Sequence, residues 1–167
     1  MELRPELMPP ALDEALIARL AKLAAGLDGA RPGQWEDDLD EFNRLAGTSI
    51  PFEAFQGIYG SEDHEDYVRR VLYYQRVKPA LGVTRAELTE VVRRAMPQNE
   101  IFHQHEAYMA VFDANVPLDG ASNLIFYPPD YDAGTNTWGG GRSMSEYEPT
   151  PEQIVEWALA PRKDHLR

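Results

Sequence analysis

The sequence predicts an all-α protein made of two similar four-helix units in tandem, each with a short third helix. Near the N-terminus, leucines recur at the spacing of an amphipathic helix, at positions 12, 16, 20, 23 and 27. Two capping boxes, Thr84 with Glu87 and Thr150 with Gln153, stand before further apolar helical patterns. The same order of elements occurs in both halves, as is typical of tandem copies of one supersecondary unit. A single eight-helix domain is the competing architecture.

The first predicted unit spans residues 11–78. Its first helix is expected to end at Gly26, because glycine just after an apolar periodic stretch marks a helix end. A second helix is expected over about 34–46, with acids in its N-terminal half, where they suit the helix dipole. A short aromatic piece, 52–60, then leads to a last helix that we expect Ser61 to cap.

The second predicted unit spans 82–161 and contains a long inserted loop, 130–148. Its helices are expected over about 84–96, 99–114 (capped by Asn99), 122–128 (a single turn) and 150–160. The loop is rich in glycine and holds Tyr131, Trp138 and Tyr147. Two roles are open for it: a second contact surface, or a strap folded over the first unit.

The stretch 121–128 is predicted to form one helical turn that carries two rings at its end. Its apolar block is too short for an ordinary helix, and the prolines at 128 and 129 stop a strand. Such a turn buries Leu124 and Ile125 and leaves Phe126 and Tyr127 at the surface. Exposed rings beside a rigid proline suit a protein-binding anchor. The alternative is that both rings are ordinary core residues.

The helix over 99–114 carries a second candidate surface. Four residues at spacings of four, three and four share one side of it: Phe102, Glu106, Met109 and Asp113. Acids beside apolar side chains are unusual on a solvated face and common on a recognition face. The alternative is a wide core stripe that includes two stray acids.

The charge balance favours a basic partner. The chain has 28 acidic and 16 basic residues, which gives a net charge of −12. This excess argues against a nucleic-acid binder, whose surface must neutralise phosphates, and against an anionic membrane surface. An acidic face raises the rate of association with a basic protein. The alternative is that the charge only keeps the protein soluble.

The amino-acid composition also indicates the cellular compartment and excludes some kinds of disulfide and metal site. The chain has no cysteine, which excludes disulfides and cysteine-based zinc sites and is compatible with a reducing compartment. We see no secretion signal and no apolar run long enough to cross a bilayer, so a cytoplasmic location is expected. His103 and His105 are two apart on a helix and point about 200° apart, so they do not hold one ion together. We therefore expect no metal.

Segments of the second half come in the order found in the immunity proteins of nuclease colicins and S-type pyocins, which the chain resembles over about 82–161. The segments are the Thr84 capping box, the helix ending near Phe112, the stretch 120–128 and the helix that opens with Thr150-Pro151. Those immunity proteins are small, acidic and four-helical. Their third helix is one short turn with an acid, two tyrosines and a proline. The first half is similar only in pattern, with Gly60 where the proline would stand.

The resemblance implies inhibition by binding, in the cytoplasm of a bacterium. Family members hold a cognate DNase toxin from the same cell and dock beside its active site. The short third helix is their common anchor, and the exposed face of the second helix selects the partner. The anchor here would be Ser122, Asn123, Phe126, Tyr127 and Pro128. The selecting face would be Phe102, His105, Glu106, Met109 and Asp113.

Two positions depart from the family's anchor. Asn123 stands where the family has its acid, and Phe126 stands where it has its first tyrosine. Losing a charge-assisted hydrogen bond costs on the order of 1.5–3 kcal/mol, so a diverged nuclease or a partner of another class remains open. We expect an immunity protein against a basic nuclease toxin, with no catalytic activity and no cofactor. The alternatives are a helical adaptor or scaffold without a toxin, and a small acid–base or metal enzyme that uses His64.

Overall fold

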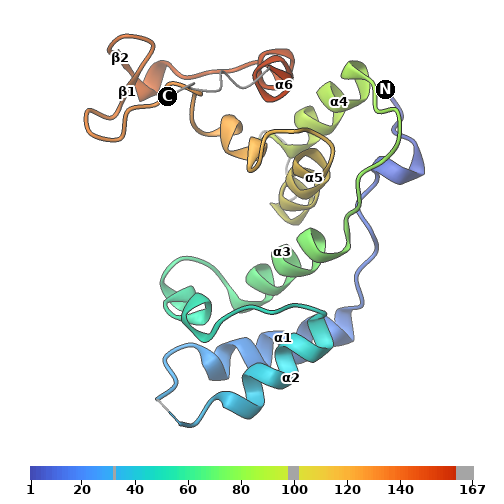
Figure 1. Ribbon diagram of the computed structural model, residues 1–167, viewed down its shortest axis with the longest axis vertical. Helices are drawn as coiled ribbons and strands as arrows, with labels where there is room; N and C mark the ends of the chain where they lie inside the picture. The colour runs from blue at the N-terminus through green and yellow to red at the C-terminus, as the bar shows by residue number, and fades with distance from the viewer. Residues whose placement is uncertain (32, 98–101, 161–167) are drawn as a thin grey trace, which may run out of the picture. The chain divides into compact units, whose positions relative to one another are not determined.

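The computed structural model describes residues 1–31, 33–97 and 102–160, and the chain is predominantly α-helical (Figure 1). It divides into two compact units. The N-terminal unit is Pro9–Val77, and the C-terminal unit is the chain from Lys78 onward together with Met1–Met8. The predicted all-α class is confirmed. The sequence predicted a boundary between 78 and 82 and contained no signal that Met1–Met8 joins the second unit.

Among its described residues, the N-terminal unit has three α-helices and two short 3₁₀ helices. They are α1 (Glu14–Leu27), α2 (Glu36–Ala46), η2 (Phe52–Phe55), η3 (Ile58–Gly60) and α3 (His64–Arg76). Helix α1 packs against both α2 and α3. Their apolar faces enclose a core centred on Phe42, Phe55 and Leu72, each fully buried, and the Phe42 and Phe55 rings meet edge to face at 4.8 Å.

Two predicted helix ends in this unit are wrong. Helix α1 continues past Gly26 to Leu27, whose side chain is fully buried. A helical glycine costs about 1 kcal/mol, and burying a leucine contributes about 1.5–3 kcal/mol, so burial prevails. Helix α3 is capped by Asp63, which accepts a hydrogen bond from the Glu65 amide at 2.7 Å. The Ser61 hydroxyl instead donates to the Ile58 carbonyl at 3.2 Å and closes η3.

The C-terminal unit has a helical frame with a small hairpin inserted before its last helix. Its elements are η1 (Pro5–Leu7), α4 (Arg85–Ala95), α5 (Phe102–Ala114), η4 (Ala121–Ile125), β1 (Thr137–Trp138), β2 (Arg142–Ser143), η5 (Met144–Glu146) and α6 (Pro151–Leu159). Helix α4 packs against both α5 and α6, and η4 also contacts α5 and α6. Both predicted capping boxes, at Thr84 and Thr150, are present. The predicted cap Asn99 lies outside the described residues.

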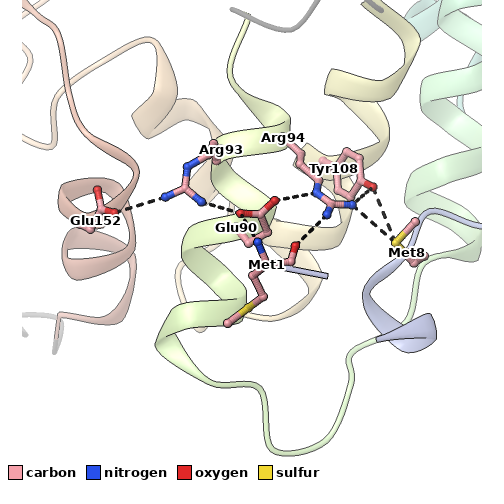
Figure 2. Close-up of polar contacts among 7 residues, drawn as sticks. All are labelled: Met1, Met8, Glu90, Arg93, Arg94, Tyr108 and Glu152. Atoms are coloured by element: carbon pink, nitrogen blue, oxygen red, sulfur yellow. Dashed lines mark hydrogen bonds and ion pairs between the residues drawn. The ribbon is translucent and has the colours of Figure 1, made fainter. Parts of the chain in front are cut away.

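Arg94 is one of the residues that hold the segment Met1–Met8 on α4 and α5 (Figure 2). The Arg94 guanidinium donates to the Met1 carbonyl oxygen at 3.1 Å and to the Tyr108 hydroxyl at 3.0 Å. Its Nη1 atom also lies 3.8 Å from the Met8 sulfur. Leu7 of this segment is fully buried, so the segment contributes to the core of the C-terminal unit.

Glu90 links this arrangement to the last helix (Figure 2). Its carboxylate, in a residue only 9% exposed, accepts hydrogen bonds from Arg93 and Arg94, and Arg93 also pairs with Glu152 of α6 at 3.5 Å. Burial raises the pKa of Glu90, but the hydrogen bonds from Arg94 and Arg93 outweigh burial and hold the pKa below its ordinary value. The Glu90 carboxylate therefore stays charged. Through Arg93 and Arg94 it links α4 to Glu152 of α6 and to Met1.

The helical elements of the two units follow a similar order along the chain, apart from η1 and η5, which among the described residues occur in the C-terminal unit only. Two α-helices are followed by a short 3₁₀ segment and a final α-helix, as α1, α2, η2 with η3, and α3 in one unit and α4, α5, η4 and α6 in the other. The hairpin occurs in the C-terminal unit only, as far as the described residues go. Within the same residues, no helix combines the length and the apolar character that a bilayer crossing requires.

Candidate partner-binding site

The short helix η4 is fastened to α5 by a carboxylate. Asp113, in the last turn of α5, accepts hydrogen bonds from the Ser122 amide at 2.7 Å and from the Ser122 hydroxyl at 2.8 Å. Gly120 precedes η4 with a φ of 65°, a left-handed conformation that glycine adopts without strain. A Cβ atom at Gly120 would also lie only 3.1 Å from the Asn123 Nδ2 atom. The sequence places glycine where the chain turns into η4.

This turn divides its four apolar residues between the core and the surface. Leu124 and Ile125 are each 6% exposed, whereas Phe126 is 45% exposed and Tyr127 is 49% exposed. The expected exposure of the two rings is confirmed, and the alternative that both are core residues is wrong. The Asn123 carbonyl accepts the amides of Phe126 at 3.0 Å and Tyr127 at 2.8 Å, so the backbone carrying the rings is ordered.

An open depression of about 550 Å³ lies beside Tyr127. Its lining includes Leu118, Asp119, Gly120, Asn123, Tyr127 and Tyr131. The rings of Tyr127 and Tyr131 are 4.9 Å apart between centroids and inclined at 44°. The Tyr131 hydroxyl donates to the Asn136 Oδ1 atom at 3.0 Å, which fixes the second ring. The exposed anchor thus continues into a concave surface that aromatic, aliphatic and polar residues line.

The predicted anchor residues do not all face outward. Asn123, Phe126 and Tyr127 are exposed. Ser122 is only 8% exposed, and Pro128 is also buried. Ser122 is engaged with Asp113, so we correct its expected role from partner contact to positioning of the turn.

The predicted selecting face on α5 is only partly accessible. His105 is 6% exposed, so its expected place on an open face is wrong. Asp113 is half-buried and binds Ser122, and Glu106 and Met109 are half-buried. The side chain of Phe102 lies outside the described residues. Helix α5 buries residues on much of its circumference, so helical spacing alone did not separate a core side from an open side.

The loop 130–148 is more ordered than the sequence predicts. Strands β1 and β2 pair antiparallel, with Trp138 opposite Arg142, and the Arg142 guanidinium carbon lies 3.6 Å from the centre of the Trp138 ring. The three glycines between the strands all have positive φ, a local signal for a tight turn. Two-residue strands are too short for an alternating pattern, so the sequence analysis missed them.

Tyr147 attaches this loop to its own unit. Its hydroxyl donates to the Leu124 carbonyl of η4, and its ring is stacked with Trp157 of α6 at a centroid distance of 6.4 Å. Burial, with a smaller contribution from the Asp130 charge, raises the pKa of Tyr147 to about 12. These contacts hold the end of η4 against α6. The loop's role as a second contact surface stays a prediction.

The N-terminal unit has a comparable arrangement around Tyr59, which is 78% exposed. The Asp28 side chain, only 2% exposed, accepts hydrogen bonds from the amides of Gly57 and Tyr59 and contacts the His64 Nε2 atom, each at 2.9 Å. Burial raises the pKa of Asp28, but hydrogen bonds from Tyr59, His64 and Gly57 outweigh it and lower the pKa. A carboxylate therefore fastens an exposed tyrosine turn in each unit. No local sequence signal marks Asp28, because its partners lie 29 to 36 residues away.

Over the described residues, no group of three or more histidine and acidic side chains is arranged to hold a metal ion. His64, the residue named for a possible enzyme, contacts Asp28 at the start of α3. Comparisons of the chain with models of protein families, with curated proteins and with solved structures found no match.

Proposed function

We propose that this chain is an immunity protein that binds and inhibits a cognate basic nuclease toxin by docking beside the toxin's active site. The observation that carries the proposal is the pair of exposed rings, Phe126 and Tyr127, on a turn that Asp113 fastens to α5. Half-exposed rings contribute less to stability than fully buried rings do, whereas a binding surface uses such rings as hot spots. The resemblance of residues 82–161 to bacteriocin immunity proteins points to the same turn.

The order of the turn favours tight binding. Side chains that are already held in place lose less conformational entropy when a partner covers them. The backbone under both rings is fixed by the Asn123 carbonyl, and Tyr147 holds the Leu124 carbonyl from the other side. Truncating a central aromatic residue of an interface typically costs about 2–4 kcal/mol, and we assign that range to Tyr127.

The net negative charge of the chain supports a basic protein as the partner. The net charge of −12 attracts a cationic surface over a distance of about 10 Å at moderate salt and so raises the association rate. A nuclease domain has to present positive charge to a phosphate backbone. An acidic inhibitor and a basic nuclease are therefore complementary before any short-range contact forms.

We assign the selection of one toxin over others to accessible residues near the anchor. Glu106 and Met109 on α5 keep this role because both are half-exposed, and Asn123 belongs to the anchor itself. Phe102 remains part of the proposed selecting face. Asp113 acts through Ser122 and positions the turn, as described above.

We further propose that the two units arose from one immunity-like unit by duplication. The shared order of helical elements supports this origin. So does the exposed tyrosine beside a carboxylate-fastened 3₁₀ turn in each unit, Tyr59 with Asp28 and Tyr127 with Asp113.

An inhibition titration tests the proposed function. A basic nuclease domain encoded beside this chain is purified, and its DNase activity is measured as the chain is added. Wild-type protein is expected to abolish cleavage at equimolar amounts, and Phe126→Ala and Tyr127→Ala to require a large excess. Tyr74→Ala is the matched control, because Tyr74 is 47% exposed and lies in the other unit. Binding without loss of DNase activity would contradict the proposal.

A further inference from the structure

The sulfur of Met8 is the point on which two hydrogen-bond donors converge (Figure 2). The Arg94 Nη1 atom and the Tyr108 hydroxyl oxygen each lie 3.8 Å from it. Met8 is 43% exposed, so a small oxidant reaches the residue. We propose that Met8 is a site of reversible oxidation by hydrogen peroxide. The sulfoxide oxygen accepts hydrogen bonds from Arg94 and Tyr108 and so tightens the segment Met1–Met8 on α4 and α5.

The surrounding hydrogen bonds direct one hydrogen of each donor at the sulfur. The Tyr108 hydroxyl accepts from Arg94 Nη1 at 3.0 Å, which leaves its own hydrogen for Met8. Nη1 carries two hydrogens, one for that hydroxyl and one for the sulfur. The Arg94 Nε atom donates to Glu90 at 2.9 Å, and Nη2 donates to the Met1 carbonyl oxygen at 3.1 Å. The guanidinium is therefore fixed with Nη1 toward Met8.

A thioether makes poor use of these two donors. Its sulfur is a weak, uncharged acceptor, whereas a sulfoxide presents a polar oxygen. An oxygen added to the sulfur and turned toward the donors lies nearer to both than the sulfur does. The contacts of 3.8 Å then shorten toward about 2.7–3.2 Å, the ordinary length of a hydrogen bond. The bond from Arg94 is also strengthened by the charge of the guanidinium.

The oxidation is a two-electron step whose only co-reactant is hydrogen peroxide. A lone pair of the sulfur attacks one peroxide oxygen, the O–O bond breaks and an S–O bond forms. The proton on the transferred oxygen passes to the departing hydroxide, which leaves as water. The sulfur becomes chiral, and one of the two epimers points its oxygen between Arg94 and Tyr108. Methionine sulfoxide reductases, one for each epimer, reverse the step.

The surroundings of Met8 reverse the usual effect of methionine oxidation. In an apolar core, a sulfoxide oxygen lacks hydrogen-bond partners and disrupts the packing. Met8 instead lies half open beside a hydroxyl and a guanidinium, and the neighbouring Leu7 supplies the buried apolar contact of the segment. Oxidation at Met8 is therefore expected to stabilise the segment, which is the opposite of the effect in a core.

Hydrogen exchange after peroxide treatment tests this site. The full chain, with ¹³C-labelled methionine methyl groups, is treated with hydrogen peroxide until NMR shows that Met8 is converted. Exchange is then measured at the Leu7 amide, which donates to the Arg4 carbonyl at 3.0 Å. We expect this amide to exchange at least about tenfold more slowly in one sulfoxide epimer than in untreated protein, as one added hydrogen bond to a charged donor implies. Reduction by the two reductases should restore the original rate.

Three substitutions assign the effect to this sulfur and its donors. Met8→Leu keeps the other methionines and is expected to show no slowing after peroxide treatment. Tyr108→Phe keeps the ring, removes one donor and is expected to lose most of the slowing. Met8→Gln places an amide oxygen near the donors and is expected to slow exchange at Leu7 without peroxide, relative to Met8→Leu. Circular dichroism of each untreated variant confirms that it is folded.

The direction of the change decides the proposal. Unchanged or faster exchange at Leu7 in both epimers overturns it, because the sulfoxide oxygen then gains nothing from the two donors. Slowing that persists in Met8→Leu also overturns it, because another methionine is then responsible. Slowing that requires both Met8 and Tyr108 supports the proposal, and it does so whether or not the chain inhibits a nuclease.

Discussion

Replacing Asp113 with alanine is expected to loosen the anchor while the helical frame stays folded. The substitution removes both acceptors that hold the start of η4, one for the Ser122 amide and one for the Ser122 hydroxyl. Ser122 is only 8% exposed, so water has little access to replace the lost partners. Replacing Ser122 with alanine is the graded comparison, because it removes one of the two hydrogen bonds.

The expected cost follows from these contacts. A hydrogen bond to a charged group contributes about 1.5–3 kcal/mol, so Ser122→Ala is expected to destabilise η4 locally by that amount. Asp113→Ala removes two coupled bonds and leaves a buried amide without a partner. We expect about 3–4 kcal/mol for it, less than twice the cost of the single bond because the two bonds share one acceptor group.

Hydrogen exchange measures this loosening residue by residue. The Tyr127 amide, bonded to the Asn123 carbonyl, is expected to exchange roughly 140-fold to 700-fold faster in Asp113→Ala, since each 1.4 kcal/mol is a factor of ten. Amides of α4 should keep their protection. Glu156→Ala, which removes an exposed carboxylate on α6, is the control. Unchanged exchange at Tyr127 in Asp113→Ala would refute the role given to Asp113.

Two further predictions concern pH. The pKa of Asp28 is lowered by folding, so its carboxylate stabilises the N-terminal unit above its ordinary pKa of 3.8, and this contribution is lost as the pH falls through the lower folded value. Acid unfolding of the wild type, followed by circular dichroism, should show this loss of stability. The Asp28→Asn variant should be less stable than the wild type at neutral pH, and its stability should depend less on acid. Equal acid sensitivity of the two proteins would count against the role given to Asp28. The pKa of Tyr147 is raised to about 12, so its contribution is complete below pH 10 and is lost as the pH rises through about 12. Burial also raises the pKa of Tyr67, so absorbance at alkaline pH should detect a late-titrating fraction of tyrosines whose amplitude falls in Tyr147→Phe. An unchanged amplitude in that variant would show that the wrong residue was assigned.

Local signals in the sequence predicted the helical frame. The capping boxes at Thr84 and Thr150 were found because every group involved lies within four consecutive residues. The exposure of Phe126 and Tyr127 followed from a short apolar block that two prolines terminate. The cap of α3 was misplaced because Ser61 and Asp63 stand two residues apart and both residue types cap helices well.

Contacts between distant residues were not predictable in this way. The hydrogen bonds of Asp28 reach residues 29 to 36 positions away, and nothing local marks that aspartate as buried. The selecting face was partly wrong because α5 is covered on several sides, which places His105 inside although its neighbours Glu106 and Met109 are half-exposed. The depression beside Tyr127 is lined by residues between Leu118 and Tyr131, which come together only through the fold of the chain between them.

The central claim is that Phe126 and Tyr127 are buried by a protein partner. Isothermal titration of the nuclease domain with wild type and Tyr127→Ala tests it most directly, with thermal unfolding of both proteins measured in parallel. We predict that the substitution weakens binding by about 2–4 kcal/mol, or roughly 30-fold to 1,000-fold, and leaves the unfolding temperature unchanged. An unchanged dissociation constant, or a variant that no longer folds, would contradict the account.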